Sequence, residues 1–187
     1  MNEEERYLFE VQGYLHVPQV LTADELRRLN SSVDQCGPPK PPAPGTGILR
    51  GLSDLLSRPV PLSEPFRELL DHPVIAPRLD EMIGEGHRLD MNPVGILMDA
   101  GDDGGPLHGG GADRASLVQS AFFHANRFYT GMVVVEFFLA AEGPGDGGLG
   151  IIGGSHKAEL PLPDSMTQPT GSRGETAILL TPPCHLY

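Results

Sequence analysis

The sequence has little of several features that would place it in a specialised class of protein. Of its 187 residues only two are cysteines, Cys36 and Cys184, which lie far apart and form no Cys-x-x-Cys pair. A disulfide framework and a zinc ribbon are therefore not expected. No apolar run approaches the roughly eighteen residues of a membrane-spanning helix. The acidic residues 1–6 also lack the apolar core of a secretory signal, so we expect a cytoplasmic protein without a membrane partner.

Positive charge is scarce as well. The chain has 13 Lys and Arg against 25 Asp and Glu, a formal net charge of −12. Because nucleic-acid binding needs a basic patch, this balance argues against a nucleic-acid partner. Tryptophan is absent, whereas glycine (24) and proline (19) are abundant, a composition typical of short strands and loops rather than a helix bundle. The length fits one domain over residues 1–187 with a core of its own.

Helices are expected in the first half of the chain. Thr22 and Glu25 form a capping box, and apolar residues at helical spacing follow them, which predicts an amphipathic helix over residues 23–34. A short helix is expected to end near residues 7–10, and two more are expected within residues 63–70 and 74–84, the first of them with proline in its first turn.

Strands are expected mainly in the second half. The run at 132–139 is almost wholly apolar, which predicts a central strand covered on both faces, with 149–152 pairing behind the turn that follows it. Residues 37–47 hold five prolines and three glycines and are expected to form a loop. Helices followed by strands indicate an α+β protein whose helices flank an antiparallel barrel or jelly roll. The other expected strands are residues 13–18, 87–92, 94–98, 117–123 and 176–180.

Two polar residues are notable among these elements. His108 lies at a glycine-rich strand end and is either a metal ligand or a loop histidine. Glu136 lies inside the apolar run at 132–139. Because a buried carboxylate is costly unless it is paired or bound to a metal, Glu136 is a metal ligand, a paired residue or a residue at the rim of the barrel.

Several stretches along the chain form a recognisable ordered set. They are Gly13–Pro18 with Leu21–Leu26, Leu70–Val74 with Leu79–Gly84, Leu107–Gly110, Gly143–Gly148 and Gly154–Lys157. Taken in order, these stretches resemble the phytanoyl-CoA dioxygenase family of Fe(II)/2-oxoglutarate-dependent oxygenases, and the resemblance covers most of the chain. It implies a double-stranded β-helix (a cupin-like jelly roll) with N-terminal flanking helices, Fe(II) and 2-oxoglutarate as cofactors, and oxidation, typically hydroxylation, of a small organic substrate.

The metal site that the resemblance implies has two histidines and one carboxylate, with open positions for 2-oxoglutarate and oxygen. His108 matches the first histidine, and His185 matches the second. The family's carboxylate position corresponds to Gly110, which has no side chain, and Asp113 is an alternative carboxylate from the loop. A metal site with glycine at this position also resembles that of the iron halogenases, in which chloride occupies the ligand position that the carboxylate would otherwise fill.

One further family feature has no counterpart here. Family members continue beyond the second histidine with a strand whose arginine binds the distal carboxylate of 2-oxoglutarate, and Arg173 precedes the matching strand. The chain thus resembles a family member without its last barrel strand or strands. A sheet edge exposed in this way would favour self-association. A catalytically inactive jelly-roll domain that binds a small ligand or a partner protein, and a halogenase-type enzyme, stay open as alternatives.

Overall fold

The structure is a computed structural model of the chain. It describes residues 1–37, 50–91, 93, 95–97, 107, 121–125, 127–141, 149–158, 160, 162–166, 178–180 and 185–186. The loop expected at 37–47 lies outside the described residues except for its first glycine.

The two longest helices of the first half both begin with a capping box. In α1 (Glu3–Gln12), Asn2 and Glu5 form a capping box, and the helix ends at Gly13 with φ +80°. In α2 (Ala23–Gln35), Thr22 and Glu25 form the predicted box. The helices expected within 63–70 and 74–84 are present as shorter elements. These are α3 (Glu64–Glu68), η2 (Leu69–Asp71) and α4 (Ala76–Met82), and further 3-10 turns are η1 (Leu55–Ser57), η5 (Ser155–Lys157) and η6 (Asp164–Met166).

All described strand pairs are antiparallel and short. One sheet has the order β1-β9-β6, and the other pairs are β2-β3, β4-β5 and β7-β8. The sheet β1-β9-β6 joins strands from the two ends of the chain. The strands are β1 (Leu15–His16), β2 (Arg50–Leu52), β3 (Gly95–Leu97), β4 (Ala121–His124), β5 (Arg127–Thr130), β6 (Val135–Glu136), β7 (Leu149–Ile151), β8 (Ile178–Leu180) and β9 (His185–Leu186).

Three strand predictions are wrong in detail. The central strand expected at 132–139 is reduced to β6, because only two of its residues pair with β9 and Val134 is 41% exposed. The following strand, β7, pairs with β8 instead of β6. Residues 87–91, the described part of the strand expected at 87–92, form no strand, and Leu89 and Met91 are exposed. The sequence also did not predict β5, which pairs with β4 in a hairpin.

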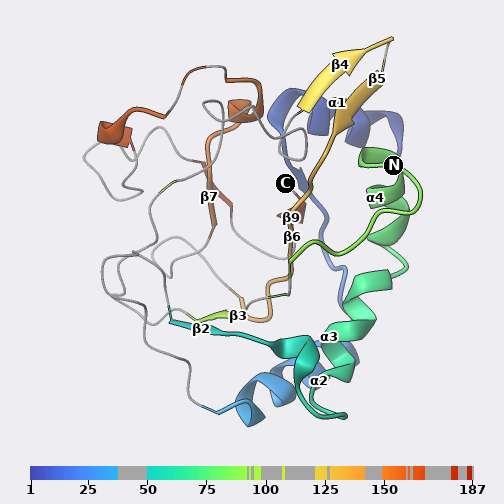
Figure 1. Ribbon diagram of the computed structural model, residues 1–187, viewed down its shortest axis with the longest axis vertical. Coiled ribbons are helices and arrows are strands. Elements are labelled where there is room, and N and C mark those ends of the chain that lie inside the picture. Colours follow the sequence, from blue (N-terminus) through green and yellow to red (C-terminus); the bar gives the residue numbers. More distant parts are fainter. Residues whose placement is uncertain are drawn as a thin grey trace.

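The described core consists of two apolar clusters toward opposite ends of the long axis. One joins α1, β1 and α4, with Ile75 only 1% exposed. The other joins α2, η1 and α3, with Leu29 only 1% exposed. In Figure 1, α2 and α3 lie at one end of the molecule, α1 and the β4-β5 hairpin lie at the other, and β6 and β9 lie between them. The segment 133–139 packs on both clusters and so connects them.

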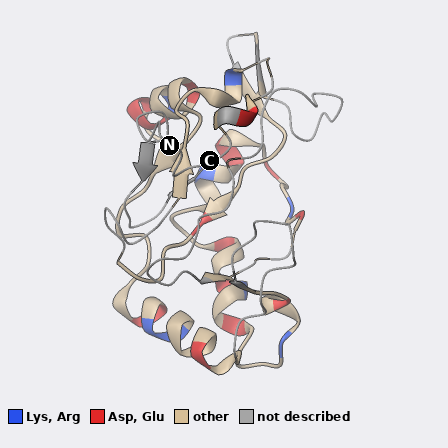
Figure 2. Ribbon diagram, turned by 90° about the vertical axis from the view of Figure 1, so that its left-hand side faces the viewer, with Lys and Arg blue, Asp and Glu red and all other residues tan. Residues whose placement is uncertain are grey.

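The charged residues are spread over the helices at both ends of the molecule. Figure 2 shows Lys and Arg interspersed with Asp and Glu there. Ion pairs such as Arg78–Glu5, at 2.6 Å, link α4 to α1. Among the described residues, every helix is too short or too polar to cross a membrane.

Candidate functional site

Three ionisable residues stand in one row across the sheet β1-β9-β6. His185 of β9 lies opposite His16 of β1 in the register, and it also lies opposite Glu136 of β6. Residues that face each other across antiparallel strands share one face of the sheet. We call these three residues the polar row. The strand register brings two histidines and one glutamate to neighbouring backbone positions.

The next row of the same sheet is apolar and identifies the opposite face. Leu186 lies opposite both Leu15 and Val135, and Leu15 is a buried member of the cluster formed with α1 and α4. Val133, Val135 and Phe137 pack against this cluster as well. Because side chains alternate between the faces of a strand, His16 and Glu136 belong to the face turned away from these helices.

The described members of the polar row are partly covered. The Oε2 atom of Glu136 is buried, although the residue as a whole is only partly covered. Partial burial of the imidazole lowers the pKa of His16. Burial thus favours the neutral form of this imidazole, which is the form that can bind a metal ion.

The structure describes only part of the metal site that the sequence predicted. His108, Asp113 and Gly110 lie outside the described residues, and for His185 the backbone in β9 is described but the side chain is not. Among the described side chains, no three His, Cys, Asp or Glu residues gather closely enough to hold a metal ion. The sequence pattern indicated Glu136 as a possible metal ligand but gave no such signal for His16, because the place of His16 beside β9 follows from tertiary pairing alone.

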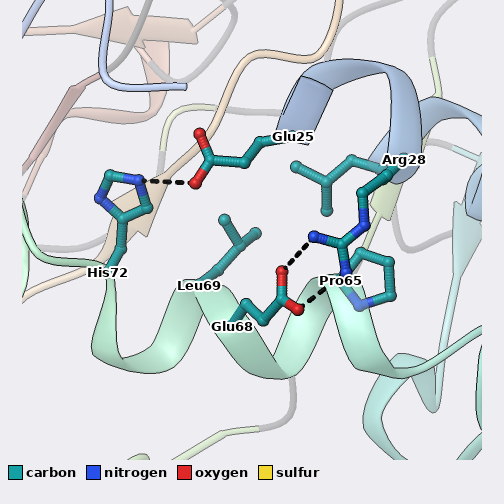
Figure 3. A pocket seen from close by; sticks show the side chains of 7 residues that line it. Glu25, Arg28, Pro65, Glu68, Leu69 and His72 are labelled. Carbon is teal, nitrogen blue, oxygen red and sulfur yellow. Dashed lines mark hydrogen bonds and ion pairs between the residues drawn. The ribbon is translucent and has the colours of Figure 1, made fainter. Parts of the chain in front are cut away.

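A second polar cluster lies between α2 and the α3-η2 segment, where it lines a small pocket (Figure 3). His72 is 4% exposed, and its Nε2 lies 3.5 Å from Oε1 of Glu25. The backbone N–H of Val74 donates to Nδ1 of His72 at 3.3 Å. Since Nδ1 accepts this bond, the proton of the neutral ring is on Nε2 and points to Glu25.

Glu25 and its neighbours in this pocket are engaged with one another. The Thr22 hydroxyl and N–H donate to Oε2 of Glu25 at 2.6 and 2.7 Å, and these bonds, the hydroxyl's first, lower the pKa of Glu25. Arg28 binds Glu68 through two bonds of 2.7 Å. These contacts tie α2 to α3 and η2, so the cluster has a structural role.

His156 also has a structural role. Its Nε2 lies 3.1 Å from the carbonyl oxygen of Glu10 in α1, and its ring meets Phe128 edge-on with centroids 5.9 Å apart. Burial lowers the pKa of His156, and nearby Lys157 adds to this effect. The residue therefore anchors the end of α1 to the η5 turn.

The fold defined above is an α+β arrangement in which helices cover short antiparallel strands. It is shared with HygX from Streptomyces hygroscopicus. The structure of HygX with nickel, 2-oxoglutarate and hygromycin B bound matches with a TM-score of 0.77 and 23% identity, covering 100% of this chain and 77% of the HygX chain. HygX with nickel and 2-oxoglutarate bound matches with a TM-score of 0.77 and 24% identity, over the same shares of the two chains.

A third HygX structure, with iron bound, matches with a TM-score of 0.70 and 21% identity, covering 100% of this chain and 76% of the HygX chain. No protein-family model matches the sequence, and no curated protein matches it either. The comparisons thus show the fold of this chain. Its chemistry has to be argued from its own residues.

Proposed function

We propose that this chain is an oxygenase-like protein that uses Fe(II) and 2-oxoglutarate and acts on a small organic substrate. The observation that carries the proposal is the shared fold with HygX, whose structures contain iron or nickel, 2-oxoglutarate and hygromycin B. The ordered motifs of the phytanoyl-CoA dioxygenase family and the two-histidine, one-carboxylate composition of the polar row support it independently.

The proposed site lies in a jelly roll of which the sheet β1-β9-β6 is one part. His108 and His185 hold the metal ion as neutral imidazoles, as their match to the family's histidines implies. Iron and 2-oxoglutarate, when bound, supply oxygen activation and oxidation of a substrate C–H bond. The chain's own contribution is to position the donors, and on the opposite face of the sheet Leu15 and Val135 pack against the apolar cluster of α1 and α4.

The direct test is an anaerobic titration of the full chain with Fe(II) in the presence of 2-oxoglutarate. We expect the visible metal-to-ligand band of an iron–2-oxoglutarate complex, and succinate release once oxygen is admitted. His108→Ala and His185→Ala should each remove the band, while His124→Ala, which changes an exposed histidine at the end of β4, should leave it unchanged. Absence of both the band and succinate in the parent protein would contradict the proposal.

A second candidate is a jelly-roll domain that binds a small ligand or a partner protein without catalysis. Glycine at position 110 favours it, because the family's usual carboxylate is missing there. Metal binding separates the two candidates. If His108→Ala binds Fe(II) as tightly as the parent protein, the non-catalytic candidate is preferred.

A further inference from the structure

The segment 133–139 depends on the helices for its position. Among the described residues, β6 is the part of this segment that pairs with another strand, and it is two residues long. So short a ladder is stable only where its strands pack on other elements. Val133, Val135 and Phe137 pack on the cluster formed with α1 and α4. Leu139 packs on the cluster formed with α2, η1 and α3, so the segment is held by helices from both ends of the molecule.

Asn30 of α2 adds a polar bond to the second of these attachments. Its Nδ2 atom donates to the backbone oxygen of Leu139 at 2.9 Å and to that of Leu26, one turn earlier in α2, at 3.1 Å. Both hydrogens of the amide are thus used. The bond to Leu139 joins residues 109 positions apart in the chain. It therefore fixes where residue 139 lies relative to α2, which a bond within the helix does not do.

A second contact links the same stretch to α2. The ring of Phe137 meets the ring of His72 edge-on, with centroids 6.3 Å apart. Nε2 of His72 lies 3.5 Å from Oε1 of Glu25 in α2, and Figure 3 shows the two side chains facing each other. Phe137 and Leu139 follow closely on β6, and a strand advances only about 3.3 Å per residue. A displacement of Leu139 is therefore transmitted to β6.

β6 is in turn one of the two strands that hold β9. In the sheet, β9 lies between β1 and β6, and the backbone of His185 stands opposite Glu136. In Figure 1, β6 and β9 lie between the end of the molecule that carries α2 and the end that carries α1. The backbone of β9 is thus placed from both ends, through β1, which follows α1, and through β6, which α2 holds.

We propose that Asn30 is a positioning residue of the site: its bond to Leu139 fixes β6, and through β6 it fixes β9, the strand of the predicted metal ligand His185. This inference rests on the proposed function and adds to it a residue that acts from outside the polar row. The competing explanation is that Asn30 stabilises the whole fold without a particular effect on β9. In that case its loss would lower the protection of all slowly exchanging amides equally.

The test is native-state amide hydrogen exchange of the full chain, measured by NMR. Asn30→Asp keeps the shape of the side chain, removes both donors and places a carboxylate against two carbonyl oxygens. We expect exchange in β6 and β9 to quicken roughly three- to tenfold, the effect of one lost hydrogen bond on a local opening equilibrium, while exchange in α4 keeps the rate of the parent protein. The matched control is Gln35→Glu in the same helix, where the amide donates to Ser31 within α2; exchange in β6 and β9 should not change.

The second measurement is the anaerobic titration with Fe(II) in the presence of 2-oxoglutarate. Because a displaced β9 carries its ligand with it, Asn30→Asp should weaken Fe(II) binding by roughly three- to tenfold and shift the metal-to-ligand band. Gln35→Glu should bind Fe(II) as the parent protein does. A loss of general stability alone would move neither the band nor the affinity of the folded protein.

The two measurements separate failure of the inference from failure of the proposed function. Equal exchange in the Asn30 and Gln35 variants, or a uniform rise at all slowly exchanging amides, would overturn the inference. So would an unchanged Fe(II) affinity in Asn30→Asp when exchange in β9 rises selectively. If the parent protein shows no band, the proposed function fails, and the exchange rates still decide whether Asn30 positions β9. Asn30→Ala, compared with Gln35→Ala, carries the same test if circular dichroism shows that Asn30→Asp does not fold.

Discussion

The end of helix α1 offers a sharp test of how distant parts of the chain are held together. Its last carbonyl groups are bound by residues from the η5 region. Nε2 of His156 lies 3.1 Å from the oxygen of Glu10, and the N–H of Gly154 donates to the oxygen of Gln12 at 2.7 Å. Gly13 ends the helix with φ +80°, and a Cβ atom there would lie 2.1 Å from Nδ1 of His156. Gly13→Ala should therefore displace the His156 ring.

The expected loss of folding stability in Gly13→Ala has two parts. Placing a side chain at positive φ costs about 1–2 kcal/mol. Moving the His156 ring forfeits its bond to Glu10, about 0.5–1.5 kcal/mol, and weakens its edge-on contact with Phe128, about 0.5–1.5 kcal/mol. We expect Gly13→Ala to lower the free energy of unfolding by about 2–5 kcal/mol.

Gly86 provides a matched control, because its φ is +77° and nothing lies within 4 Å of a Cβ built there. Gly86→Ala should cost only the backbone part, about 1–2 kcal/mol. Urea denaturation of both variants measures the difference. In a His156→Ala background the additional cost of Gly13→Ala should fall to that of Gly86→Ala. Equal costs for the two glycine variants in the parent background would refute the reasoning.

Two further predictions concern pH and packing. Burial lowers the pKa of His156, so the unfolded chain binds a proton at this residue more readily than the folded chain does. The contribution of His156 to stability is therefore complete above the ordinary histidine pKa of about 6.5 and is lost as the pH falls below that value. Denaturation midpoints measured between pH 8 and pH 5 should decline less in His156→Ala; an unchanged slope would contradict this. Leu29 is 1% exposed, so Leu29→Ala should lower the free energy of unfolding by about 2–5 kcal/mol. Val60 is 71% exposed, so Val60→Ala should change it by no more than about 0.5 kcal/mol. Thermal melting compares the two variants, and equal losses would show that the Leu29 cluster is not a core.

Local signals in the sequence predicted the helices well. The capping box of Thr22 and Glu25 fixes where α2 begins, because both bonds form within one turn of the helix. Strands were predicted less accurately, since a strand needs a partner that can lie anywhere in the chain. The run at 132–139 has the composition of a long strand, yet only Val135 and Glu136 find a partner, in β9.

The sequence by itself determined the start of α2, the α+β class and the resemblance that singles out His108, Gly110, Asp113 and His185. Only the tertiary structure decided which residues pair with His185. His16 and Glu136 come from opposite halves of the chain, and both lie opposite His185 in the strand register because β9 pairs with both β1 and β6. Backbone hydrogen bonding imposes no limit on the sequence separation of paired strands, so no local pattern could have revealed the polar row.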